Sequence, residues 1–216
     1  MAAGSSSAPI ELSSDEDEPQ RKRPKVPVIE RLSLAQGLLD DGILQRVAAI
    51  AQQSNCIGCD GRGLAQAVAS KLPYGCSYAD RRCMPPTKKF AVPEDRAVPG
   101  TIDVRRPPAA VLSGGNRRPI VINMFAQWEM GPPGKYNRVQ PAPQDSAAAR
   151  QGWFASCLEA IGLLNPPVES IAFPEQIGCG LAGGDWRMYE KMITDFAARH
   201  PQTRVIIVRM AAHRTR

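Results

Sequence analysis

Glycine residues are concentrated at two points where an apolar, strand-like segment runs into a helix-like one. Residues 176–186 read QIGCGLAGGDW, with four glycines between an apolar run at 170–174 and an amphipathic segment that opens at Trp186. Residues 58–63 carry three more glycines in the same setting. Because glycine costs conformational entropy on folding, such clusters indicate that something needs the bare backbone.

The chemistry that two such loops offer is phosphate binding. A helix N-terminus presents unpaired N–H groups and the positive end of the helix dipole. Successive bare amides also form an anion-binding concavity. Loops that follow different strands of an open sheet would close on one diphosphate from both sides, beyond the carboxyl ends of the strands. The sequence therefore predicts a nucleotide-diphosphate pocket.

Other site classes lack their motifs. Neither loop ends in the Gly-Lys-Ser/Thr of a P-loop, and residues 58–63 have their glycines in the wrong order for a dinucleotide-binding fingerprint. Cys56 and Cys59 have a zinc-like spacing, but Cys76 and Cys83 are too far apart to complete a zinc ribbon. We therefore expect no metal and no cofactor. Without a signal-peptide pattern, we expect an intracellular protein whose six cysteines are reduced.

The hydrophobic pattern alternates between strands and amphipathic helices. Strands are predicted at residues 46–51, 101–104, 120–125, 169–173 and 204–208, with residues 52–55 ending the first of them. Helices are predicted around the apolar faces 64–72, 154–161 and 186–196. This alternation predicts an α/β protein with a largely buried sheet.

The ends of the chain differ from the middle. Residues 1–30 are polar and lack an apolar period, which predicts a disordered tail. A domain at 31–210 and a basic C-terminal tail at 211–216 complete the expected organisation. In the first tail, Ile10 and Leu12 precede an acidic run in a pattern that resembles a SUMO-interacting motif, with a plain solvated tail as the alternative.

A basic cluster in the same tail indicates import into the nucleus, with the cytoplasm as the alternative location. Its residues are Arg21, Lys22, Arg23 and Lys25. The net charge of +6 fits a polyanionic partner, either a nucleotide or a nucleic acid. Basic pairs within residues 74–118 either line an anionic path or are solvated loop charges, and the second interpretation is favoured. No stretch is long and apolar enough to span a membrane, and we expect a monomer.

Four strings stand out together: QSNC at 53–56, GRGLA at 61–65, NMFAQ at 123–127 and above all PEQIGCGLAGGDW at 174–186. On these strings the chain, from about Leu34 to Met210, resembles a macro domain, the ADP-ribose-binding module. The resemblance implies three α/β/α layers with a mixed, largely parallel central sheet. The last string is similar to the branch related to ADP-ribose 1''-phosphate phosphatases and to hydrolases that remove ADP-ribose from acidic side chains.

The resemblance implies a role for each matching residue. Asn55 should hydrogen-bond the distal ribose, Gln127 should border it, and residues 58–63 should wrap the ribose and the diphosphate. Amides of the second glycine loop should bind the phosphates. The implied ligand-binding set is Asn55, Cys56, Gly61, Gly63, Leu64, Gln127, Ile177, Gly178, Cys179, Gly180 and Leu181.

The chain departs from the family pattern in two places: where members hold the adenine base of the ligand, and where one branch places its catalytic residues. Many members hold the adenine with a Gly-Asp pair that is missing here, so Asp40 or Asp41 is the substitute. The lysine and aspartate of one hydrolase branch correspond to Gln127 and Ala182.

The sequence offers few catalytic candidates. Asp185 is either a helix N-cap or a general base that would act with Asn55. Cys179 lies among amides that would lower its pKa and make it a nucleophile, although a side chain packed under the loop is favoured.

Three functions stay open at this point. The first is hydrolysis of ADP-ribose 1''-phosphate, or removal of ADP-ribose from protein or nucleic acid. The second is a non-catalytic reader that binds ADP-ribosylated macromolecules in the nucleus. The third is a basic nucleic-acid-binding protein that uses residues 74–118. The departures at Gln127 and Ala182 favour a reader or a phosphatase over the lysine-dependent hydrolases.

Overall fold

The computed structural model describes residues 29–112, 117–136, 138–140 and 142–212. The SUMO-interaction-like motif and the basic cluster of the N-terminal tail lie outside these residues, so both stay predictions. The described fold begins with a strand at Glu30, which pairs with Ile206 near the other end of the chain. The two ends of the domain are therefore joined by one strand pair.

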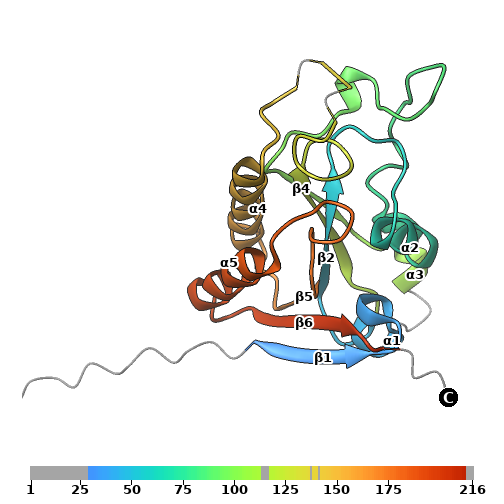
Figure 1. Cartoon of the computed structure of the whole chain (residues 1–216). Helices are drawn as coiled ribbons and strands as arrows, with labels where there is room; N and C mark the ends of the chain where they lie inside the picture. The colour runs from blue at the N-terminus through green and yellow to red at the C-terminus, as the bar shows by residue number, and fades with distance from the viewer. Residues whose placement is uncertain (1–28, 113–116, 137, 141, 213–216) are drawn as a thin grey trace, which may run out of the picture.

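A six-stranded sheet forms the middle layer (Figure 1). The strands are β1 (Glu30–Leu34), β2 (Ala49–Asn55), β3 (Ile102–Arg105), β4 (Ile120–Gln127), β5 (Ser170–Pro174) and β6 (Arg204–Met210). Their order is β1-β6-β5-β2-β4-β3. All neighbours pair in parallel except β3, which runs antiparallel to β4 at the edge. The mixed, largely parallel sheet is confirmed.

Helices cover both faces of the sheet (Figure 1). They are α1 (Asp41–Leu44), α2 (Leu64–Lys71), α3 (Ala109–Leu112), α4 (Ala147–Gly162) and α5 (Trp186–Arg199), with short 3₁₀ turns at Gly37–Leu39, Pro73–Gly75 and Pro93–Asp95. On one face α4 and α5 join at an edge-to-face contact between Phe154 and Tyr189, whose ring centroids lie 4.5 Å apart. On the other face α1 and α2 bury Leu44 and Val68. The three-layer prediction is confirmed.

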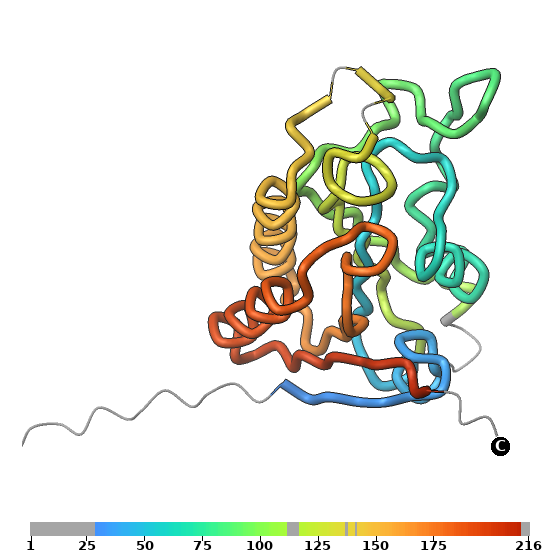
Figure 2. The backbone as a smooth tube through the Cα atoms, viewed as in Figure 1, coloured from blue at the N-terminus to red at the C-terminus, as the bar shows by residue number. Residues whose placement is uncertain are grey.

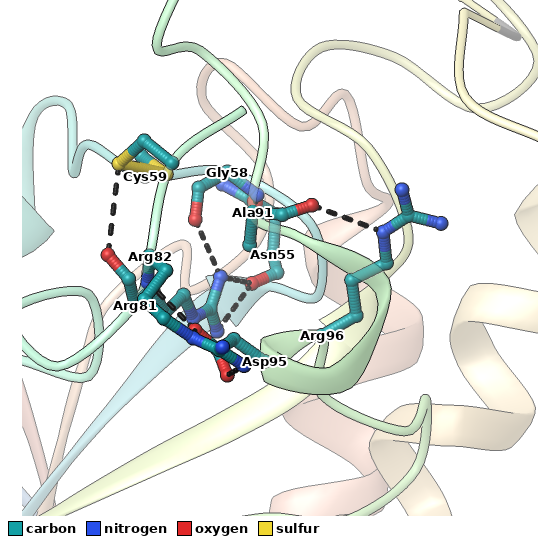
Figure 3. Close-up of a disulfide and its surroundings, with 9 residues drawn as sticks. Asn55, Gly58, Cys59, Arg81, Arg82, Ala91, Asp95 and Arg96 are labelled. Carbon is teal, nitrogen blue, oxygen red and sulfur yellow. Dashed lines mark hydrogen bonds and ion pairs between the residues drawn. A yellow bond between two sulfur atoms is a disulfide. The ribbon is translucent and has the colours of Figure 1, made fainter. Parts of the chain in front are cut away.

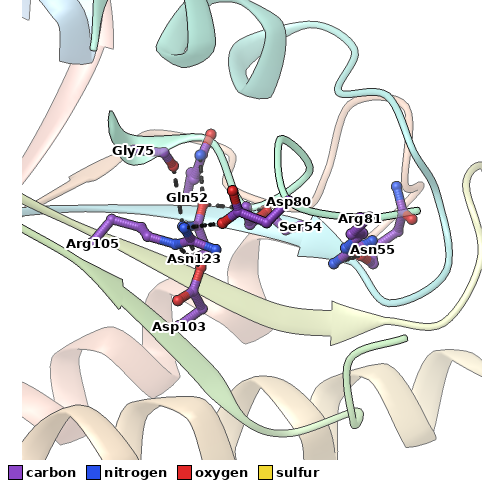
Figure 4. Close-up of polar contacts among 10 residues, drawn as sticks. Gln52, Ser54, Asn55, Gly75, Asp80, Arg81, Asp103, Arg105 and Asn123 are labelled. Atoms are coloured by element: carbon purple, nitrogen blue, oxygen red, sulfur yellow. Dashed lines mark hydrogen bonds and ion pairs between the residues drawn. The ribbon is translucent and has the colours of Figure 1, made fainter. Parts of the chain in front are cut away.

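The polar residues after the first predicted strand do not end it. β2 continues to Asn55 in the centre of the sheet, because its buried polar side chains find partners (Figure 4). Gln52 Nε2 donates to Asn123 Oδ1 at 2.7 Å, and Asn123 Nδ2 donates to the carbonyl of Gly75 at 3.2 Å. The prediction that residues 52–55 end the strand is therefore wrong. Hydrogen bonding replaces the apolar contact that pattern analysis looks for.

A disulfide joins Cys59 to Cys83, with their Cα atoms 6.0 Å apart (Figure 3). It links the loop after β2 to a segment that also pairs with it through a backbone bridge between Gly58 and Phe90. The expectation of reduced thiols is wrong for this pair. Among the described residues no cluster of side chains could hold a metal ion, and no helix is long and apolar enough to cross a membrane.

Asn123 lies at the centre of the buried amide network, and we predict that its removal destabilises the fold. Replacing Asn123 by alanine leaves the Gln52 amide and the Gly75 carbonyl unpaired in the interior, so we expect the free energy of unfolding to fall by about 2 kcal/mol in urea denaturation. The control is Ser156→Ala, which removes an exposed hydroxyl bonded to Gly152 and should change it by less than about 0.5 kcal/mol. Equal effects of the two changes would contradict this account of β2.

The disulfide makes a second prediction. Thiol titration of the denatured chain should find four free cysteines without reductant and six after reduction. The bond closes a loop with a sequence separation of 24, so Cys83→Ser should lower the free energy of unfolding by about 3 kcal/mol. Cys76→Ser, at a free thiol, is the matched control. Six reactive thiols without reductant would show that the bond does not form.

Candidate functional site

The loops that follow β2, β4 and β5 gather at one edge of the sheet, as the cyan, yellow and orange segments of Figure 2 show. They surround a cleft of about 1310 Å³. Its walls include Asn55 at the end of β2, Gln127 at the end of β4 and Gly178 after β5. The parallel strands all point their carboxyl ends toward this edge, which is where ligands of open α/β sheets bind.

Three of the four glycines in the second loop are required by the fold. Gly178 and Gly183 have left-handed backbones, with φ of +71° and +68°. A Cβ on Gly184 would lie 2.7 Å from the carbonyl oxygen of Gly178 and would also meet the Tyr189 ring. Gly180 is different, because its φ is ordinary and no atom lies within 4 Å of the Cβ position. Gly180 lines the cleft, so its bare backbone serves the cleft and not the fold.

Between Gly178 and Gly184, four residues line the cleft and have a backbone amide without a hydrogen-bond partner among the described residues. They are Gly178, Gly180, Leu181 and Ala182. The Cys179 amide, in contrast, donates to the Gln176 carbonyl at 2.9 Å and closes a turn. Of the four amides that the resemblance implies, those of Gly178, Gly180 and Leu181 are thus unpaired among the described residues, and that of Ala182 joins them in place of Cys179. Unpaired amides that face one concavity form a site for an anion.

The N-terminus of α2 forms the opposite wall. Gly63 has a φ of +58° and stands at the helix start, where no side chain caps the first amides. Gly63 and Leu64 line the cleft, and a Cβ on Gly63 would lie 4.0 Å from Leu181 Cδ1. The two glycine loops therefore meet across the cleft. Gly61 does not line it and instead allows close packing on Ala65.

Asn55 both lines the cleft and holds the first loop. Its Oδ1 accepts the Gly58 amide at 2.5 Å, and the Tyr78 hydroxyl accepts the Asn55 amide at 3.0 Å. Arg81 donates to the carbonyls of Asn55 and Gly58 at 3.2 and 2.6 Å (Figure 3). Burial raises the pKa of Tyr78 and lowers the pKa of Arg81, but these contacts favour the charged guanidinium. The loop is thereby tied to the end of β2.

The thiol of Cys56 lies beneath this loop and not in the cleft wall. Its side chain is fully buried, and its backbone amide donates to the carbonyl of Gln127 at 3.0 Å. Burial raises the pKa of the thiol. Cys56 therefore supports the site from behind.

Both polar atoms of the Gln127 side chain form hydrogen bonds. Its Oε1 accepts from Gln53 Nε2 at 2.7 Å, and its Nε2 donates to the carbonyl of Glu129 at 3.2 Å. Gln53 also lines the cleft and was missed as a site residue, although its position two residues before Asn55 puts both on the same face of β2. Gln53 Oε1 is buried without a partner among the described residues.

Asp185 and Cys179 do not have the reactive settings considered for them. Asp185 Oδ1 accepts the Arg187 amide at 2.9 Å and caps α5, and Asp185 is not part of the cleft wall. Burial, aided by the negative charge of Asp185, raises the pKa of Cys179 to about 11. The lowered pKa expected for this thiol is therefore wrong, and at neutral pH it stays protonated. Ile177, below the loop, does line the cleft.

Asp40 and Asp41, one of which was expected to contact the adenine base, form other hydrogen bonds and ion pairs. Asp40 caps α1 by accepting the Gly42 amide at 3.0 Å. Asp41 pairs with Lys71 at 3.1 Å and with Arg118 at 3.4 Å, and the hydrogen bond from Lys71 lowers its pKa. Neither lines the cleft, so their expected role is not supported by their positions. That end of the cleft is instead lined by Gln36, Gly37, Leu38, Leu39 and Glu175.

Most of the basic pairs are surface charges, as the favoured interpretation expects. Arg82 pairs with Asp95 at 2.9 Å, and hydrogen bonds from Arg82 lower the pKa of Asp95 to about 2. Arg105 bonds Asp103 at 2.7 Å. Only Lys89 of these pairs lines the cleft, where Arg62 also lies. Neither of these two cations has an ion pair with the described residues, so both add positive charge to the cleft.

The geometry of the second glycine loop predicts different outcomes for the same substitution at Gly184 and at Gly180. Gly184→Ala places a Cβ against the Gly178 carbonyl and the Tyr189 ring, so we expect the free energy of unfolding to fall by about 2 kcal/mol. Gly180→Ala meets open space and should change it by less than about 0.5 kcal/mol. Thermal or urea denaturation of both variants checks this. Similar losses at the two positions would mean that Gly180 is also a structural requirement.

Comparisons with known proteins identify the fold. No protein-family model and no curated protein sequence matches the chain. Among solved structures, it is similar to the macrodomain of Mycobacterium tuberculosis DarG, with a TM-score of 0.56 and 18% identity over 86% of this chain and 100% of that one. It is also similar to the macrodomain of Thermus aquaticus DarG, with a TM-score of 0.54 and 18% identity over 83% of this chain and 97% of that one. The chain therefore has the macrodomain fold.

Proposed function

We propose that the cleft binds ADP-ribose or an ADP-ribosylated group. One observation carries this proposal: Gly178, Gly180, Leu181 and Ala182 line the cleft with amides that have no partner among the described residues, and a side chain at Gly180 would meet open space. The diphosphate lies on these amides. The macrodomain fold and the resemblance of residues 174–186 to ADP-ribose-binding modules support the choice of ligand.

The electrostatics of the cleft suit a diphosphate. Each hydrogen bond between an amide and a charged phosphate contributes about 1.5–3 kcal/mol. The uncapped start of α2 faces the array across the cleft, and Arg62 and Lys89 add positive charge. In this arrangement the distal ribose lies toward Asn55, and the base lies toward the Gln36 end. Gln53 Oε1, buried behind Gly178 without a partner among the described residues, is an acceptor and suits a ligand hydroxyl, not a phosphate oxygen.

The side chains favour a reader over a hydrolase. Gln127 and Ala182 occupy the positions of the lysine and the aspartate that one hydrolase branch uses, and the Gln127 amide is bonded on both sides. Asp185 caps a helix, and the Cys179 thiol is protonated at neutral pH. A nuclear role for such a reader is supported by the basic cluster of the tail.

The test is a calorimetric titration of ADP-ribose into the whole chain. We expect saturable binding that Gly180→Glu abolishes, because a carboxylate there fills open space beside the phosphates and repels them. The matched control is Gly152→Glu, on α4, where a Cβ also meets no atom within 4 Å but the residue lies outside the cleft wall. It should bind as tightly as the wild type. No saturation at millimolar ligand, or equal losses in both variants, would rule out the proposal.

A turnover assay separates reader from enzyme. The chain is incubated with ADP-ribose 1''-phosphate and with ADP-ribosylated protein, and released phosphate or ADP-ribose is measured. A reader releases neither. Release that disappears in Asn55→Ala would instead establish a hydrolase that needs Asn55, for which a positioned water with amide stabilisation of charge is the mechanism we expect.

A further inference from the structure

Helix α4 carries a buried arginine that contacts two of the three loops around the cleft, those that follow β4 and β5. Arg150 is only 2% exposed. Its Nε and Nη2 each donate to the carboxylate of Asp145 at 2.6 Å. Nη1 donates to the carbonyls of Gly131 and Ala182 at 2.7 and 3.0 Å, and Nη2 donates to the carbonyl of Glu129 at 3.2 Å. These contacts use all the N–H donors of a guanidinium.

The carbonyl partners belong to two different loops. Glu129 and Gly131 are in the loop that follows β4, whereas Ala182 is in the glycine loop that follows β5. Gly131 and Ala182 both line the cleft, but Arg150 does not. The loops also touch directly, since a Cβ on Gly183 would lie 3.2 Å from Pro132 Cβ. Arg150 is thus a polar link between two walls of the cleft and is itself shielded from any ligand.

The contact with Ala182 bears on the unpaired amides. A carbonyl that is bonded to the guanidinium behind the loop is held away from the cleft. The neighbouring amides of Gly180, Leu181 and Ala182, in residues that line the cleft, are then left without a partner inside the loop. Glycine-rich backbone has many other conformations, so this geometry needs an external constraint. The paired Asp145 cancels the charge of the arginine, which allows the group to be buried.

We propose that Arg150 is a positioning residue that holds the loops after β4 and β5 in the ligand-binding conformation before the ligand arrives. The ligand in question is that of the proposed function, on which this part of the inference rests. Preorganisation of this kind strengthens binding because the loops need not be ordered when the complex forms. Arginine is needed because its planar fork reaches five acceptor positions at once, which a lysine ammonium cannot do.

The first test compares Arg150→Lys with the wild type. Lysine keeps a cation beside Asp145 but loses the fork, so we expect a folded chain by circular dichroism whose Kd for ADP-ribose rises by about tenfold or more. The control for general destabilisation is Phe196→Leu, which alters a buried α5 side chain outside the cleft wall and should leave the Kd within about twofold. A folded Arg150→Lys protein that binds ADP-ribose as tightly as the wild type would overturn the proposal.

The second test needs neither a ligand nor a variant. The Gly184 amide donates within the glycine loop to Gly178, and the Lys135 amide donates within the other loop to Pro132, at 2.9 and 3.2 Å. If Arg150 joins the loops, these two amides open together, and hydrogen exchange of the unliganded wild type should give them similar protection. Protection factors that differ by about tenfold or more would contradict the link. Wild-type protein that does not bind ADP-ribose would refute the proposed function and leave this result standing.

Discussion

The hydrogen bond from the Gly184 amide to the Gly178 carbonyl closes the loop on which the cleft depends. At 2.9 Å it brings the two ends of the loop together, and it leaves no room for a Cβ on Gly184. Gly180, Leu181 and Ala182, which lie between them, line the cleft, and in the described part of the chain the amides of Gly180 and Leu181 have no partner. The surface that we propose for anion binding therefore arises from backbone geometry, with glycine as the only residue type that permits the closure.

This loop needs a rigid frame. β5 delivers it from the centre of the sheet, and α5, capped by Asp185, begins directly after it. The first glycine loop is fixed by Asn55, Arg81 and the Cys59–Cys83 disulfide. The cleft is consequently bordered by loops that are bonded to the sheet, to helices and to each other. Such a frame suits recognition of a ligand by backbone amides, whose positions must be held closely.

Sequence patterns predict the layers of this fold but not all of its contacts. The apolar periods at 120–125 and 186–196 mark β4 and α5, because burial of one face dominates there. The extent of β2 could not be read from its residues, since Gln52 is buried through a partner 71 positions away. The Cys59–Cys83 bond likewise depends on the three-dimensional approach of two loops.

In the candidate site, too, the sequence predicts some features, whereas others depend on contacts in three dimensions. Resemblance identifies Asn55, Gln127 and the second glycine loop; Asn55, Gln127 and part of that loop line the cleft. It does not tell which amides of that loop are free, because hydrogen bonding inside a turn decides whether Cys179 or Ala182 faces a ligand. Arg150 has no sequence signal at all, since a single arginine in a helix is normally a surface residue.

The central claim is that backbone amides of the glycine loop bind a diphosphate. The most direct measurement is a titration of ADP-ribose followed by amide NMR resonances of the isotope-labelled chain. The account expects the largest shift changes at the amides of Gly178, Gly180, Leu181 and Ala182, with a smaller change at Cys179, whose amide is already bonded. Shift changes that leave these four amides unaffected, or no changes at saturating ligand, would contradict it.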